Sequence, residues 1–254
     1  MTPADTSSLQ CALADRVRAV EGRVAAACGR AGRDRDSVTL VAVSKTRASS
    51  EILAAVEAGV RHLGENRPEE ADEKISLVND GARAAGLAAP AWHMIGHVQS
   101  RKAPLVVGRY TLVHSLDSLK LGRRLARLAA QEGAVLDCLV QVNVSGEDSK
   151  GGYLVPEPDR DLPAVFLNEL DRLQALPDIR LRGLMTIPPV GDSAEEARPY
   201  FRRLRQLRDR LERLFPGGDW SELSMGMTDD FEVAIEEGAT LVRVGRAIFG
   251  PRTA

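Results

Sequence analysis

Residues 38–45 read VTLVAVSK, a short apolar run that ends in a lysine. Val41, Ala42 and Val43 would place apolar side chains on both faces of a strand, which is typical of parallel strands covered on both sides. Leu139, Val140 and Val142 repeat the pattern later in the chain. These runs predict a buried parallel sheet and an α/β protein.

Short apolar runs of this kind recur along the whole chain, with room for a helix between each and the next. The eight predicted strands span residues 38–45, 62–66, 91–96, 112–116, 136–144, 181–187, 222–227 and 241–245. Leucines at helical spacing, as in residues 204–214, predict amphipathic helices between strands, and one more helix is expected at about residues 8–28. This alternation predicts a single (β/α)8 TIM-type barrel with an extra N-terminal helix. An open doubly wound sheet is the alternative, although no G-x-G-x-x-G motif follows the first strand.

The composition is that of an ordinary globular protein. The 254 residues include 34 Lys and Arg against 36 Asp and Glu, for a net charge of −2, and 44% are hydrophobic. We therefore expect one domain over residues 1–254, with no general attraction for nucleic acid or anionic membranes. No apolar run approaches the ~18 residues of a membrane span, and the first residues, MTPADTSSLQ, do not resemble a signal peptide. Three cysteines without metal-ligand spacing favour the cytoplasm.

Only five of the basic residues are lysines, and one of them has an unusual place. Lys45 alone stands at the carboxyl end of a predicted strand, where barrels of this type carry their active sites. A lysine shielded from water can lose its proton and attack a carbonyl to form an imine, which an arginine cannot do. The alternative is a lysine that reaches solvent or pairs with a carboxylate such as Glu65.

The last two predicted strands end in loops that could hold a phosphate. These loops read SMGMT at residues 224–228 and RVGRA at residues 243–247. In such barrels the loops after strands seven and eight often bind phosphate, through backbone N–H groups and hydroxyls such as that of Ser224. Ordinary strand-to-helix turns rich in Gly and Ser are the alternative. Arg243 alternates with two valines and should project into the barrel, where it needs a partner such as a cofactor or a carboxylate. Asn66, at another strand end, could contact a ligand or satisfy hydrogen bonds of the barrel.

Two other patterns have structural explanations. The segment FRRLRQLRDRLERLF at residues 201–215 has leucines at helical spacing, so a solvated amphipathic helix is favoured over a nucleic-acid-binding face. The four histidines lie on different predicted elements and lack metal-ligand spacing, so no metal site is assigned.

Eight blocks in order give the chain a specific resemblance to a known family. They are AVSKT (42–46), GEN (64–66), WHMIG (92–96), HSLDS (114–118), QVNVSGEDSKGG (141–152), RGLMTI (182–187), LSMGMTDD (223–230) and VRVGRAIFG (242–250). At these residues the sequence resembles the pyridoxal phosphate homeostasis proteins, whose fold is similar to the barrel domain of alanine racemase. The resemblance implies that Lys45 binds pyridoxal 5′-phosphate (PLP) as a Schiff base. It also implies that Ser224, Gly245 and Arg246 hold the phosphate and that Arg243 faces the pyridine nitrogen.

The same resemblance implies a function without substantial catalysis. Arginine offers no lone pair and favours an unprotonated pyridine nitrogen, which makes PLP a poorer electron sink. In alanine racemase a second base comes from an additional domain, and we expect that domain to be missing because the chain ends at Ala254. We therefore predict a monomeric, cytoplasmic protein that carries or buffers PLP and supports amino- and keto-acid homeostasis, with apo PLP-dependent enzymes as partners.

Several other functions remain possible at this point. An amino-acid racemase would use the same barrel, an aldolase could form its imine on Lys45, and the Arg-rich helix could serve as an interaction module. Lys150, in the SGEDSKGG loop, is a candidate second amine that could receive PLP in transit.

Overall fold

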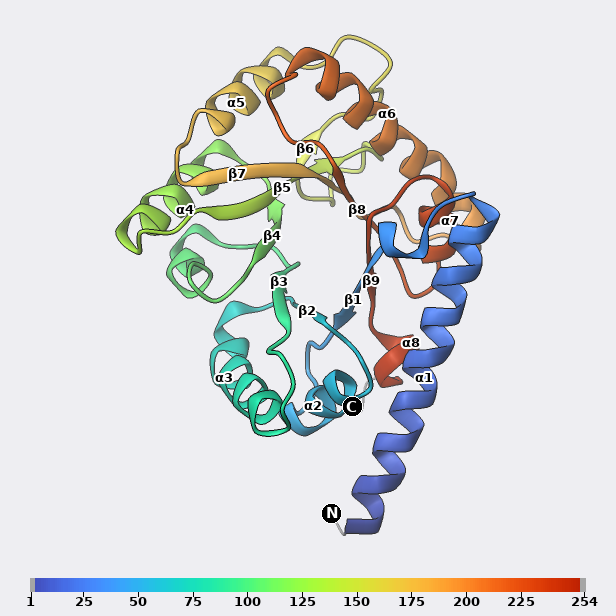
Figure 1. The fold of residues 1–254 in the computed structure, drawn as a ribbon. Coiled ribbons are helices and arrows are strands. Elements are labelled where there is room, and N and C mark those ends of the chain that lie inside the picture. The colour runs from blue at the N-terminus through green and yellow to red at the C-terminus, as the bar shows by residue number, and fades with distance from the viewer. Residues whose placement is uncertain (1–2, 252–254) are drawn as a thin grey trace.

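The structure is a computed structural model that describes the backbone of residues 3–251 and the side chains of residues 10–251. Its centre is a closed barrel of eight parallel strands, which Figure 1 shows surrounded by helices. The barrel strands are β1 (Thr39–Val43), β2 (His62–Glu65), β3 (Ala91–Met94), β4 (Leu112–Leu116), β5 (Leu136–Asn143), β7 (Ile179–Met185), β8 (Glu222–Met227) and β9 (Leu241–Val244). All eight fall on predicted strands, so the predicted (β/α)8 barrel is confirmed.

The order of the strands shows how the barrel closes. Neighbours run β4-β3-β2-β1-β9-β8-β7-β5, and a further pairing of β4 with β5 joins the two ends. Every pairing is parallel, including that of β1 with β9. A two-residue strand, β6 (Tyr153–Leu154), pairs in parallel with the end of β5. All carboxyl ends therefore meet at one mouth of the barrel, where the sequence places its candidate residues.

Helices cover the outside of the strands. They are α2 (Ser49–Glu57), α3 (Pro68–Ala84), α4 (Leu119–Gln131), α5 (Ala164–Gln174), α6 (Arg198–Leu214), α7 (Phe231–Glu236) and α8 (Arg246–Phe249), with short 3-10 helices at Arg35–Ser37, Ser100–Leu105 and Ala194–Ala197. Leu204, Leu207 and Leu211 of α6 are fully buried, so the Arg-rich segment packs as the predicted amphipathic helix. None of the helices described is both long and apolar enough to cross a membrane.

The extra N-terminal helix, α1 (Pro3–Arg30), is longer than the predicted 8–28. It packs against α2, α7 and α8, beside the place where the first and last strands pair (Figure 1). Val17, Val20 and Val24 are buried in this contact. At its edge, Arg23 donates to Glu232 of α7 at 2.8 Å. The helix therefore joins the beginning of the chain to its end.

Two groups of buried apolar side chains stabilise the fold. The larger lies between strands and helices, and the smaller consists of Val41, Leu112, Leu139, Met185 and Leu241. Because these five come from five strands around the barrel and alternate with helix-facing neighbours, they fill its interior. The remaining inward positions on several strands carry polar side chains.

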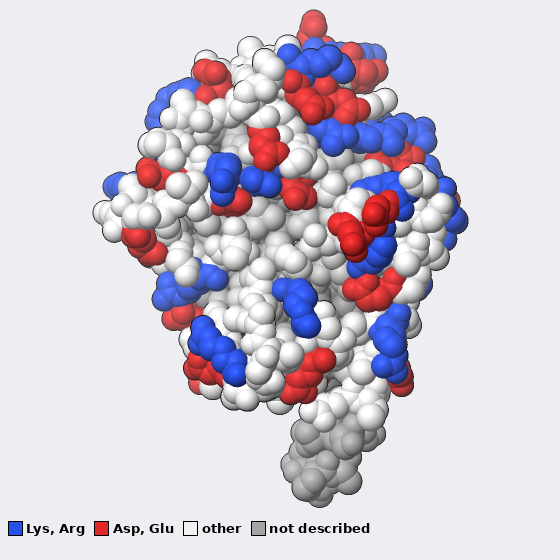
Figure 2. Space-filling view, in the orientation of Figure 1, with Lys and Arg blue, Asp and Glu red and all other residues white. Residues whose placement is uncertain are grey.

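Charges are mixed on the surface. Figure 2 shows Lys and Arg interspersed with Asp and Glu around the face that it presents, with uncharged surface near the centre. Many charged side chains of the described residues are paired, as in the contacts of Arg198 with Glu195 and Glu236. This face therefore has no extended region of a single sign.

Candidate functional site

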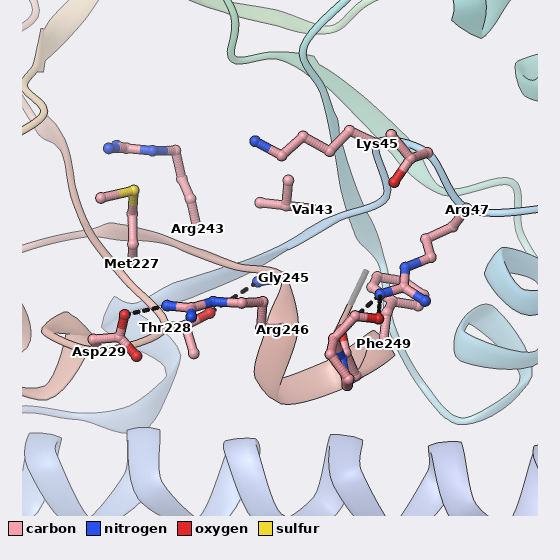
Figure 3. Close-up of a pocket in the computed structure, with 13 residues that line it drawn as sticks. Val43, Lys45, Arg47, Met227, Thr228, Asp229, Arg243, Gly245, Arg246 and Phe249 are labelled. Atoms are coloured by element: carbon pink, nitrogen blue, oxygen red, sulfur yellow. Dashed lines mark hydrogen bonds and ion pairs between the residues drawn. The ribbon is translucent and has the colours of Figure 1, made fainter. Parts of the chain in front are cut away.

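A pocket of about 540 Å³ opens at the carboxyl ends of β1, β8 and β9. Its lining side chains come from the segment after β1, the loop after β8 and the start of α8 (Figure 3): Val43, Lys45, Thr46, Arg47, Met227, Thr228, Asp229, Arg243, Gly245, Arg246, Phe249, Gly250 and Pro251. The volume lies in the range of small-molecule sites. Four of the six residues predicted to bind PLP, namely Lys45, Arg243, Gly245 and Arg246, lie together in this lining.

Lys45 forms one wall of the pocket. Figure 3 shows its side chain extended across the cavity toward Arg243. The next residue, Thr46, has a φ of 64°, which is costly for a β-branched residue and is retained only where the surroundings fix the backbone. The carboxylate of Glu65 accepts from Ser44 Oγ at 2.7 Å and from Lys74 Nζ at 2.9 Å.

Arg243 forms the opposite wall, and it projects into the barrel as predicted. Its guanidinium donates to Ser224 Oγ at 2.6 Å and to the carbonyl oxygen of Thr186 at 2.9 Å. Burial lowers the pKa of Arg243 to about 10, and the nearby charge of Asp230 opposes that shift. Because this pKa is far above 7, the group remains a charged donor at neutral pH.

The third wall is built by the loop after β8 and the start of α8. The backbone N–H of Gly245 donates to Thr228 Oγ1 at 3.3 Å, and Arg246 pairs with Asp229 (Figure 3). A backbone N–H, a hydroxyl and a guanidinium therefore meet on one side of the cavity. Such donors can bind a phosphate.

Gly226, near the end of β8, allows the strand to pack closely against α7. It has a φ of 90°, and a Cβ there would lie 2.5 Å from Ala234 Cβ and 2.9 Å from Phe231 Cα. By contrast, a Cβ at Gly245 would have only ordinary contacts, the nearest at 3.4 Å from Val43 Cβ. The structure therefore requires a glycine at position 226 but not at position 245.

Two predicted site residues lie outside the pocket lining. Ser224 is fully buried inside the barrel, where it contacts Arg243. Asn66 follows β2, and its Oδ1 is buried without a hydrogen-bond partner among the described residues. Lys150 borders a neighbouring cavity, and its Nζ donates to the carbonyl oxygen of Pro188 at 3.3 Å.

Thr228 is a pocket residue that the sequence reasoning missed. The segment SMGMT contains two hydroxyls, and the sequence analysis assigns only that of Ser224 to the phosphate. Alternation along β8 turns Ser224 inward, whereas Thr228 comes after the strand ends at Met227. Counting from the strand end would have favoured the second hydroxyl.

Known proteins resemble this chain over almost its whole length. The profile of the alanine racemase N-terminal domain family matches residues 18–253. A pyridoxal phosphate homeostasis protein of Aquifex aeolicus is 40% identical over 238 residues, which cover 94% of this chain and 97% of that protein. The chain belongs to the pyridoxal phosphate homeostasis protein family. Another member of this family, from Pseudomonas aeruginosa, is 42% identical over 241 residues, covering 94% of this chain and 96% of that one.

A solved structure connects the family to its cofactor. PipY of Synechococcus elongatus, determined with PLP bound, is 34% identical and superimposes with a TM-score of 0.77 over 94% of this chain and 100% of PipY. PipY and this chain thus share the barrel over almost their whole length.

Proposed function

We propose that this protein binds PLP in the pocket between Lys45 and Arg243, and that it carries or buffers the cofactor for PLP and amino- and keto-acid homeostasis. The observation that carries the proposal is the convergence, in one cavity of about 540 Å³, of a lysine, a buried arginine and a group of phosphate-binding donors. The proposal is also supported by the PLP bound to PipY and by the similarity to pyridoxal phosphate homeostasis proteins.

Each wall of the pocket suits a different part of PLP. When bound, PLP supplies an aldehyde whose carbon can form a C=N bond to a primary amine, with the carbonyl oxygen leaving as water. Lys45 would supply that amine. Thr228, the Gly245 N–H and Arg246 would bind the phosphate, and Arg243 would donate to the pyridine nitrogen. Ser224, which we expected at the phosphate, would instead support Arg243.

Arg243 is also the reason for proposing binding without substantial turnover. As a charged donor it would keep the pyridine nitrogen unprotonated, and stabilisation of negative charge at an amino acid α-carbon would then be weak. Such a protein would protect PLP and release it to apo enzymes, and we place it in the cytoplasm. Asn66, whose buried Oδ1 has no hydrogen-bond partner among residues 10–251, would bind a polar group of the ligand.

The test is a PLP titration followed by borohydride reduction and peptide mapping. We expect a yellow protein that carries the reduced cofactor on Lys45. Lys45→Ala should abolish the absorption band, and Lys45→Arg should not restore it, because a guanidinium forms no imine. Lys120→Ala, which removes an exposed lysine of α4, should bind like wild type. A wild-type protein without a band at saturating PLP would refute the proposal.

The second candidate is an amino-acid racemase, favoured by the match to the alanine racemase N-terminal domain. The deciding measurement is deuterium incorporation from solvent at the α-carbon of L- and D-amino acids. We expect no exchange above that of free PLP. Sustained exchange lost in Lys45→Ala would establish catalysis.

A further inference from the structure

A row of polar side chains crosses the interior of the barrel and ends on Arg243. His62 Nδ1 lies 2.9 Å from His93 Nε2, and His93 Nδ1 lies 2.9 Å from His114 Nε2. His114 Nδ1 lies 2.7 Å from Ser224 Oγ, which accepts from Arg243 at 2.6 Å. We call these five residues the histidine row.

Strand alternation explains why the row exists. His62, His93 and His114 stand on the neighbouring strands β2, β3 and β4 and alternate with helix-facing residues such as Leu63 and Trp92. Ser224 stands on β8, across the barrel from β4 in the strand order, so the contact between His114 and Ser224 crosses the interior.

The row connects the two mouths of the barrel. His62 begins β2 and lines a cavity of about 530 Å³ at the amino ends of β1 and β2, beside Glu21, Arg35, Asp36 and Arg61. Arg243, at the other end, lines the proposed PLP pocket. A continuous series of hydrogen bonds therefore joins the cavity at the amino ends of the strands to the proposed PLP pocket through the barrel interior.

Arg243 sets the direction of these hydrogen bonds. A guanidinium only donates, so Ser224 Oγ is an acceptor toward Arg243 and its own proton is available for His114 Nδ1. An imidazole that accepts at Nδ1 and is neutral carries its proton on Nε2, and it donates to the next ring. Applied to His114, His93 and His62 in turn, this rule leaves all three rings protonated on Nε2. His62, the last of them, lines the cavity at the amino ends of β1 and β2.

The electrostatics of the core are consistent with three neutral rings. Burial is the main cause that lowers the pKa of each: His93 falls to about 3, and the pKa values of His62 and His114 are also lowered. The charge of Glu222 opposes the shift at His62, whereas the charge of Arg243 adds to it at His114. No group of His, Cys, Asp or Glu within the described residues is arranged to hold a metal. The rings instead form hydrogen bonds with one another.

We propose that the histidine row is a one-way hydrogen-bonded chain that positions the Arg243 guanidinium against the bound cofactor, with Ser224, His114, His93 and His62 as positioning residues. The effect on PLP rests on the proposed function. The direction of the hydrogen bonds is independent of the proposed function. If the chain breaks in the middle, Ser224 loses the acceptor that orients its hydroxyl, and Arg243 is held less firmly.

The first test uses the protein without PLP. Nitrogen-15 NMR of His97→Gln, which removes the exposed fourth histidine, should show three neutral rings protonated on Nε2 between pH 7 and 8. A ring of His114 protonated on Nδ1 would overturn the one-way chain.

The second test compares PLP binding by wild type, His93→Gln and His93→Leu. Glutamine can accept from His114 and donate to His62, so the PLP affinity and the absorption maximum of His93→Gln should match those of wild type. Leucine can do neither, and we expect about 3- to 10-fold weaker binding and a shifted absorption maximum, since one hydrogen bond is worth roughly that factor. Equal spectra and affinities for wild type and His93→Leu would overturn the positioning role.

Two safeguards keep the second test decisive. If circular dichroism shows that His93→Leu is unfolded, His62→Gln and His62→Leu provide the same comparison at the partly exposed end of the row. If wild type binds no PLP, the proposed function fails, while the NMR measurement still decides the direction of the chain.

Discussion

Acidification should destabilise this protein mainly through its buried histidines. His93 is 3% exposed, and its pKa is lowered by burial to about 3, compared with about 6.5 in an unfolded chain. Below pH 6.5 the unfolded state therefore binds a proton that the native state does not bind until about pH 3. Stability is thus lost as the pH falls through this window. At pH 5, 1.5 units below the unfolded value, His93 alone should lower the free energy of unfolding by about 2 kcal/mol.

The assay is urea unfolding followed by circular dichroism at pH 7.5, 6.5, 5.5 and 5.0. Wild type should lose at least ~2 kcal/mol between pH 7.5 and 5.0, because the pKa values of His114 and His62 are lowered in the same direction. His93→Gln does not titrate at this position and should lose about 2 kcal/mol less over the same range. Equal pH dependence in wild type and His93→Gln, with unchanged m-values, would refute the reasoning.

Three further predictions concern other parts of the molecule. Lys74→Met should lower the free energy of unfolding by about 3–5 kcal/mol, because the carboxylate of Glu65, only 1% exposed, loses its ion pair with Lys74. Thermal unfolding measures this change, and a loss below about 1 kcal/mol would contradict the prediction. Gly226→Ala should cost roughly 2–5 kcal/mol from its positive φ and its contact with Ala234 Cβ, whereas Gly245→Ala should fold like wild type in the same urea experiment. Lys150→Ala should leave PLP on Lys45 but slow its transfer to an apo aminotransferase; unchanged transfer rates would exclude a role for Lys150 in transit.

The strands could be predicted closely because buried parallel strands leave a strong local signal. A run such as VTLVAVSK is apolar on both faces, and the run that ends at Met185 was placed within two residues of its observed start. The N-terminal helix was predicted to begin about a turn too late, since the apolar pattern starts at Leu9 while the helix begins at Pro3. The strand β6 was missed because its two residues follow the glycine-rich loop at 145–152 and carry no alternation.

The candidate site was only partly predictable, because its remaining features depend on contacts between distant strands. Lys45 and Arg243 could be placed from the ends of their own strands, and the pocket contains both. The four histidines do not have the spacing of metal ligands along the chain, so the sequence assigns them no common site. Their actual relation, side by side on adjacent strands, requires the register of the barrel, which pairs Gly64 with His93 and Met94 with Val113.

The docking of α1 has a consequence for synthesis of the chain. Arg23 is among the first residues to leave the ribosome, and its partner Glu232 follows 209 positions later. At the usual translation rate of 5–20 residues per second, the wait is roughly 10–40 s. Throughout that time α7 and α8, two of the three helices against which α1 packs, are not yet available to cover Val17, Val20 and Val24. Nascent or prematurely terminated chains should therefore expose part of this apolar face to chaperones and proteases.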